Sequence, residues 1–181
     1  GIAAIGPGRD AGRVYRFQHT EFVADLVGKI ELAPAVYPEH AASAVRAVSP
    51  SGHPLWAVNP GGKPTSGIAF QGGLLFFGTS KSELAAYATN GHMAWRRRVD
   101  SIVVGTPAVS PDGTVYAASL RGTLYALNPR GRILWSYPTG DDVVFSPVVA
   151  RSGRIYVAST RNLFAFEPGG QPAWIQKLSL P

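Results

Sequence analysis

The sequence predicts an all-β domain built from repeats, and three observations support this prediction. With 45% hydrophobic and only 15% charged residues in a length of 181, the chain can bury a core. Its 21 glycines and 15 prolines fall at regular intervals between short apolar runs, a pattern typical of strands joined by turns. The four tryptophans, Trp56, Trp95, Trp135 and Trp174, are separated by 39, 40 and 39 residues, so the sequence repeats with a period of about forty.

Each tryptophan ends one copy of the same signature, which is Ala, four residues, Gly, three residues, Trp. The copies are Ala47, Gly52 and Trp56; Ala86, Gly91 and Trp95; Ala126, Gly131 and Trp135; and Ala165, Gly170 and Trp174. We expect Gly to permit a turn and the small Ala to allow close approach. The indole would fill the gap between neighbouring repeats and offer its N–H to a backbone carbonyl. The signature therefore predicts a structural role for the tryptophans rather than a ligand-binding one.

The repeat at residues 105–137 contains four short β-branched or aromatic segments, each bounded by turn residues. They are TPAVS (106–110), TVYAAS (114–119), TLYALN (123–128) and RILWSY (132–137), which we call strands A to D. SPDG and NPRG are predicted hairpin turns, because Pro presets one turn dihedral and Gly supplies a positive φ; Asp112 is then a turn residue. Four antiparallel strands in about forty residues form the blade of a β-propeller.

The other repeats give the domain organisation, a single β-propeller domain over residues 1–181. We expect a partial blade at 1–26, blades at about 27–58, 64–98, 103–138 and 143–177, and a C-terminal strand at 178–181 that could close the first blade. LLFFGT (74–79) and ELAAYA (83–88) are strands B and C of the copy at 67–97. EFVADL (21–26) is interpreted as a D strand and the segment at Pro34 as an A strand, while residues 37–44 fit no ordinary strand.

Two arrangements remain open for the ring. GIAAIG (1–6) resembles a B strand, and residues 178–181 could pair with it and close a ring of about five blades. The alternative is a fragment of a larger propeller, in which case a further chain could complete the ring as an oligomer.

The Ala-x4-Gly-x3-Trp signature resembles the tryptophan-docking motif of pyrroloquinoline-quinone-type (PQQ-like) propeller repeats, over residues 34–176. The resemblance is to the cofactor-free branch, because quinoprotein dehydrogenases have a vicinal disulfide, impossible without Cys, and calcium-binding residues that find no match here. It implies a non-catalytic platform for a protein or peptide partner, in a periplasmic or extracellular bacterial protein. The alternatives are a fragment or divergent relative of a quinoprotein dehydrogenase, and a small propeller lectin.

Basic side chains recur at one place in the repeat, the turn between strands B and C. The candidate partner-binding residues are Lys81, Arg121 and Arg161 in three B–C turns, Arg9 in the corresponding turn of the partial blade, and Arg97 and Arg98 from a D–A connector. B–C turns and D–A connectors share one face of a propeller, so these cations could attract an acidic partner or an anionic ligand. Asp100, Asp141 and Asp142 would partly neutralise this face, and the alternative is that exposed turns simply carry charge.

The sequence does not support a metal site, a catalytic site, nucleic-acid binding or a membrane span. The four histidines, His19, His40, His53 and His92, have no metal-ligand spacing, and no catalytic or cofactor-binding constellation is present. GPGRDAG lacks the Lys-Ser/Thr of a phosphate loop. No aromatic platform accompanies the cations, which argues against nucleic acid, and no apolar run reaches the ~18 residues of a membrane span.

Overall fold

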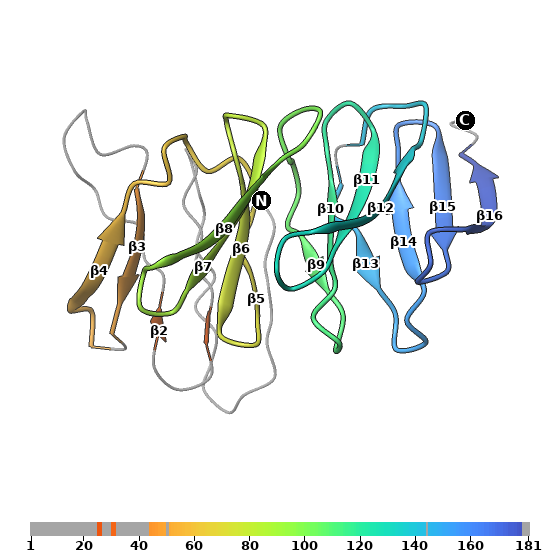
Figure 1. Cartoon of the computed structure of the whole chain (residues 1–181). Coiled ribbons are helices and arrows are strands. Elements are labelled where there is room, and N and C mark those ends of the chain that lie inside the picture. The colour runs from red at the N-terminus through yellow and green to blue at the C-terminus, as the bar shows by residue number, and fades with distance from the viewer. Residues whose placement is uncertain (1–24, 27–29, 32–43, 50, 144, 179–181) are drawn as a thin grey trace.

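The protein is a row of four antiparallel β-sheets in the computed structural model, which describes residues 25–26, 30–31, 44–49, 51–143 and 145–178. Within these residues each sheet contains four strands in chain order, and no helix occurs. Figure 1 shows the sheets following one another across the view, with β4 at one end of the row and β16 at the other. Each sheet is a propeller blade, as the sequence predicts.

We number the blades 1 to 4 in chain order. Blade 1 consists of β1 (Asp25–Leu26), β2 (Ile30–Glu31), β3 (Val45–Val48) and β4 (Pro54–Val58). Blade 2 consists of β5 (Ala69–Gln71), β6 (Leu74–Thr79), β7 (Glu83–Ala88) and β8 (Met93–Arg98). Blade 3 consists of β9 (Ala108–Val109), β10 (Val115–Ala118), β11 (Thr123–Leu127) and β12 (Ile133–Pro138). Blade 4 consists of β13 (Val148–Val149), β14 (Ile155–Ala158), β15 (Asn162–Phe166) and β16 (Pro172–Lys177).

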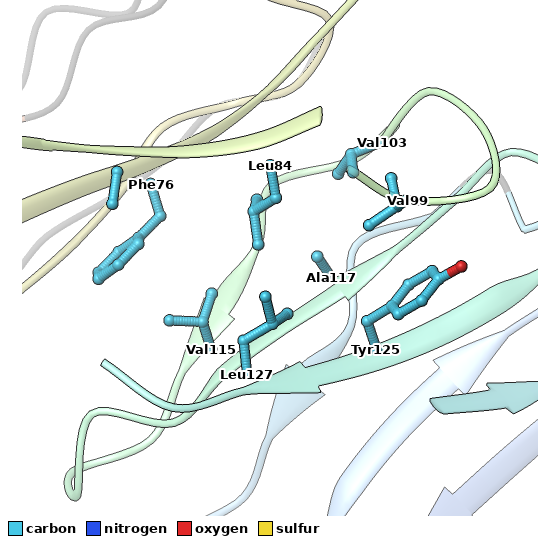
Figure 2. Close-up of a cluster of buried hydrophobic side chains, with 9 residues drawn as sticks. Phe76, Leu84, Val99, Val103, Val115, Ala117, Tyr125 and Leu127 are labelled. Carbon is cyan, nitrogen blue, oxygen red and sulfur yellow. The ribbon is translucent and has the colours of Figure 1, made fainter. Parts of the chain in front are cut away.

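The hydrophobic core lies between the blades, which explains why the B and C strands are continuous apolar runs. In β6, the residues from Leu75 to Thr79 are all buried, because the two faces of the strand meet different neighbouring blades. Figure 2 shows one such layer, where Phe76 and Leu84 of blade 2 pack against Val115 and Leu127 of blade 3. The outermost strand of each blade is mostly exposed, as in β16.

The predicted hairpin turns are present in blade 3. The N–H of Gly113 donates to the carbonyl of Ser110 at 2.8 Å, and the N–H of Gly131 donates to that of Asn128 at 2.9 Å. Both glycines have positive φ, +85° and +77°, and the pairing of β11 with β12 shifts register next to the second turn. This is a three-residue hairpin loop that ends in a glycine bulge, so glycine is needed in the left-handed conformation.

Blade 1 differs from the expectation for this part of the chain. Asp25 pairs with Glu31 and Leu26 with Ile30, and β2 then pairs with β3 through Glu31 and Val48. Residues 25–26 are therefore the first strand of blade 1, rather than the D strand of an earlier blade, and the expected boundary after residue 26 falls inside this sheet. The rest of the predicted partial blade, the strand at Pro34 and residues 179–181 lie outside the described residues.

Candidate partner-binding face

Three of the four tryptophans connect consecutive blades. Each donates its indole N–H to a backbone carbonyl in the C–D turn of the next blade. The bonds run from Trp56 Nε1 to Thr89 O (2.6 Å), from Trp95 Nε1 to Pro129 O (2.8 Å) and from Trp135 Nε1 to Pro168 O (2.8 Å). The acceptor in each case lies two residues before the signature glycine, so the signature of one blade binds the signature of the next.

The tryptophan ring of each preceding blade packs directly on the signature glycine of the next blade. An added Cβ would lie 3.0 Å from the Trp56 ring at Gly91, 2.5 Å from the Trp95 ring at Gly131, and 2.6 Å from the Trp135 ring at Gly170. Only glycine leaves room for a ring at this distance. The signature alanines are fully buried, and each pairs across its own sheet with the tryptophan of the same copy: Ala47, Ala86, Ala126 and Ala165.

The B–C turns and the D–A connectors lie together along one edge of the row, at the top of Figure 1, which we call the upper face. Backbone bonds join each turn to a connector. The N–H of Val99 donates to Ser82 O at 2.9 Å, and the N–H of Thr139 donates to Gly122 O at 2.8 Å. The turns of this face therefore have fixed backbones, and side chains on them project from a rigid support.

The structure divides the predicted cations into two groups. Arg161 Nε lies 3.2 Å from Asp141 Oδ1, and Arg97 Nε donates to the carbonyl of Gly131 in the next blade at 2.8 Å, so both have partners within the protein. The expectation that Arg97 and Arg98 belong to a D–A connector is wrong, because both lie at the end of β8, strand D of blade 2. The second group consists of Lys81, Arg98 and Arg121. Their side chains are exposed and make no hydrogen bond or ion pair with other described residues. Arg9 lies outside the described part of the chain.

Two carboxylates of the upper face have a structural role that the sequence analysis missed. Asp141, with only 7% of its side chain exposed, accepts hydrogen bonds from Asn162 Nδ2 at 2.7 Å and Ser159 Oγ at 3.3 Å. Asp100 accepts one from Thr123 Oγ1 at 2.6 Å. Each aspartate thus ties a D–A connector to the B–C turn or strand C of the following blade. The signal was present in the sequence, since the two aspartates are 41 residues apart, close to the repeat period.

Hydrogen bonding keeps two carboxylates ionised. Burial opposes ionisation of Asp100, but hydrogen bonds from Thr123, Ser119 and Tyr125 outweigh it and lower its pKa. The pKa of Asp112 is also lowered, first by the hydroxyl of Ser110 and then by the backbone N–H of Thr114, so Asp112 is the turn residue that the sequence predicts. Both groups stabilise local backbone geometry rather than pointing to acid–base chemistry.

Among the described residues, no group of three or more His, Asp or Glu side chains could hold a metal ion. His53 Nδ1 bonds the hydroxyl of Ser51 at 2.9 Å in an exposed turn, and His92 is exposed; His19 and His40 lie outside the described residues. No described helix is long and apolar enough to cross a membrane.

A family model described as "Outer membrane protein assembly factor BamB" matches residues 41–110 and 105–181. The chain belongs to this family. The match confirms the PQQ-like repeat that the tryptophan signature indicates, and it extends across all four signature copies. A search of curated proteins found no match.

Solved structures with the same fold include BamB from Moraxella catarrhalis, at 21% identity and a TM-score of 0.73, covering 87% of this chain and 48% of that one. A protein of unknown function from Bacteroides caccae matches at 14% identity and a TM-score of 0.59, covering 86% of this chain and 59% of that one. At these identities the likeness shows the fold, a β-propeller. The chain spans about half the length of the BamB structure it matches.

Proposed function

We propose that the protein is a non-catalytic β-propeller that binds a protein partner through its upper face, in the periplasm or outside the cell of a bacterium. The observation that carries this proposal is a group of exposed cations, Lys81, Arg98 and Arg121, on two neighbouring blades, whose side chains have no partner among the residues that the structure describes. The family description refers to outer-membrane assembly, which supports an exported setting and a protein partner.

The position of the three cations favours an acidic protein surface as the partner. Lys81 and Arg121 occupy the same turn of blades 2 and 3, and Arg98 pairs through its backbone with Glu83 at the start of strand C, beside the Lys81 turn. The charges therefore form one patch across two blades. Surface charges of this kind mainly set association rate and partner choice, because exposed ion pairs are individually weak.

The turn that carries Arg121 is held in place by contacts with the next connector, which reduces the entropy that binding would cost. In the Arg121 turn, the N–H of Gly122 donates to Ser119 O at 2.9 Å, and a Cβ on Gly122 would collide with the carbonyl oxygen of Asp141. The turn is thus packed beneath the next connector and keeps one shape. A preorganised surface loses less conformational entropy when a partner binds. Phe145, 56% exposed in that same connector, supplies an apolar side chain of the kind that anchors interfaces.

The test compares two triple variants that each lower the formal net charge from +6 by three. The first is Lys81→Gln, Arg98→Gln and Arg121→Gln. The control is Arg130→Gln, Arg132→Gln and Arg151→Gln, which changes exposed cations at the opposite ends of the strands. Binding of a fluorescein-labelled poly-glutamate peptide is measured by anisotropy at low ionic strength.

We expect the first variant to weaken binding about 10-fold, the effect of three exposed charge pairs worth about 0.5 kcal/mol each, and the control to change it by less than about 2-fold. Equal weakening by both variants would mean that net charge alone attracts the peptide. The upper face would then have no claim to be a binding site.

A further inference from the structure

The connector between blades 1 and 2 differs from the two connectors that follow it on the upper face. Its residues 59–66 contain no carboxylate and include two adjacent glycines, Gly61 and Gly62. The later connectors contain Asp100 and Asp141, and each of these aspartates accepts a hydrogen bond from the blade that follows it. The first connector therefore brings no anionic group to the upper face.

Two cationic side chains converge above these glycines. Arg96 Nη1 lies 3.2 Å, and Lys81 Nζ 3.8 Å, from the position that a Cβ added to Gly61 would occupy. The stem of Lys81 also packs on the connector, with its Cγ 3.2 Å from the corresponding position at Gly62. Like charges that approach the same point repel each other, so an anion bound between them would stabilise both.

One carboxylate, Glu83, lies beside Arg96 without binding it closely. The distance from Glu83 Oε2 to Arg96 Nη1 is 4.0 Å, too long for a hydrogen bond, and this oxygen has no hydrogen-bond partner among the described residues. The Arg96 side chain is 41% exposed and donates no hydrogen bond to a described residue. Two cations and one carboxylate leave a net positive charge here, and the donors of the guanidinium remain available.

Blade 4 shows how this part of the repeat holds a carboxylate. There Asp141 of the connector lies 3.2 Å from Arg161 of the B–C turn. Lys81 occupies the same turn in blade 2, but its connector supplies no carboxylate, and the neighbouring side chain is a second cation, Arg96. A carboxylate bound above Gly61 would give blade 2 the contact that blade 4 makes within the chain.

We propose that Arg96 and Lys81 bind a single carboxylate above Gly61, the side chain of an acidic residue on a protein partner. The planar guanidinium presents paired N–H donors that match the two oxygens of a carboxylate, and Lys81 adds a point charge. The net charge of these groups with Glu83 is +1, which suits a carboxylate better than a doubly charged phosphate. The site rests on the proposed function for the kind of partner, and it adds Arg96 to the residues that bind it.

The first test is Arg96→Lys, which retains the charge but removes the paired donors. Binding of the labelled poly-glutamate peptide is measured by anisotropy at low ionic strength. We expect Arg96→Lys to weaken binding about 10-fold, because hydrogen bonds between charged groups are lost. The matched control is Arg98→Lys on the same strand, which should change binding by less than about 2-fold, since Arg98 contributes charge alone.

The second test fills the space beside the two cations. Gly61→Ala, at φ +81°, places a Cβ 3.2 Å from Arg96 Nη1 and should weaken peptide binding about 5-fold or more. Gly73→Ala is the matched control, because Gly73 has φ +78°, no atom within 4 Å of an added Cβ, and a place in the A–B turn at the opposite ends of the same strands. Its variant should bind the peptide as the unchanged protein does.

NMR spectroscopy of the ¹⁵N-labelled chain locates the bound carboxylate. The poly-glutamate peptide should shift the backbone amide signals of Gly61, Gly62 and Lys81, and a poly-glutamine peptide of equal length should not. Acetate should need a carboxylate concentration at least about 10-fold higher, because it lacks the linked contacts of a peptide. Equal affinity for acetate would overturn the assignment to a side chain of a partner.

Unchanged binding by Arg96→Lys, or signal shifts spread equally over both faces of the row, would overturn the site. Neither Arg96→Lys nor Gly61→Ala alters the net charge, so this failure would leave the charge test of the proposed function intact. Equal weakening by the two triple variants, in contrast, would refute the proposed function.

Discussion

Replacing Gly131 with alanine tests whether the tryptophan contact between blades stabilises the fold. Gly131 has φ +77°, and its added Cβ would lie 2.5 Å from the Trp95 ring, so the ring must move. The left-handed backbone alone costs about 1–2 kcal/mol in alanine. Displacing the ring weakens the 2.8 Å bond from Trp95 Nε1 to Pro129 O, worth about 1 kcal/mol, and reduces aromatic packing by roughly another 1–2 kcal/mol.

The matched control is Gly140→Ala. Gly140 has almost the same φ, +79°, but nothing lies within 4 Å of its added Cβ, so this variant has only the backbone cost. We expect Gly131→Ala to lose about 3–5 kcal/mol of unfolding free energy and Gly140→Ala about 1–2 kcal/mol. Urea denaturation and thermal melting measure both, and the difference should lower Tm by at least about 4 °C. Equal losses would show that the glycine serves the turn alone, and the docking argument would fail.

Three further predictions follow from the site. Asp100→Asn should make the unfolding free energy depend less on pH in the acid range. The lowered pKa of Asp100 contributes stability that is complete above its unfolded pKa of 3.8 and is lost as pH falls through the folded pKa. Urea titrations at several pH values measure this, and an equal loss of unfolding free energy with falling pH in both proteins would contradict the prediction. Trp95→Phe keeps a ring but removes the donor to Pro129, and should lower the unfolding free energy by about 1 kcal/mol in the same assay, whereas no change would mean the bond is neutral. Pyrroloquinoline quinone with calcium should leave Tm unchanged, since bound ligand raises it; a rise would favour the dehydrogenase alternative.

Local turn chemistry explains how much of the fold could be predicted. In blade 3, the Pro-x-Gly turns at Pro111 and Pro129 fix where one strand ends and the next begins, so its hairpins lie where the turn residues indicate. Blade 1 has such a turn only between its last two strands, at Pro50, Ser51 and Gly52, and lacks this punctuation before them. Its strands Asp25–Leu26 and Ile30–Glu31 have two residues each, too short for an alternating pattern to indicate them.

The contacts of the site were harder to predict because they join different blades. Arg97 was expected to be a free cation, but its guanidinium reaches the Gly131 carbonyl of the next blade. Asp141 was expected only to dilute the positive charge, but it holds a turn and a connector together. Such partners are 18 to 34 residues away in sequence, and their distance in space depends on how one blade packs on another.

The same repeat position explains why the free cations gather on blades 2 and 3. Counting back and forward by 41 residues from Asp100 gives Asn59 before blade 2 and Asp141 before blade 4. Asn59 carries no charge and its Oδ1 accepts the N–H of Gly61 at 2.9 Å, so no carboxylate from this position opposes Lys81. The carboxylate of Asp100 accepts the hydroxyl of Thr123, and the backbone N–H of Asp100 donates to the hydroxyl of Tyr125, both in blade 3, whereas Asp141 forms an ion pair with Arg161. Arg161 of blade 4 is thus paired with Asp141, whereas Lys81 and Arg121 of blades 2 and 3 form no ion pair with described residues, so we expect an acidic partner to lie over blades 2 and 3.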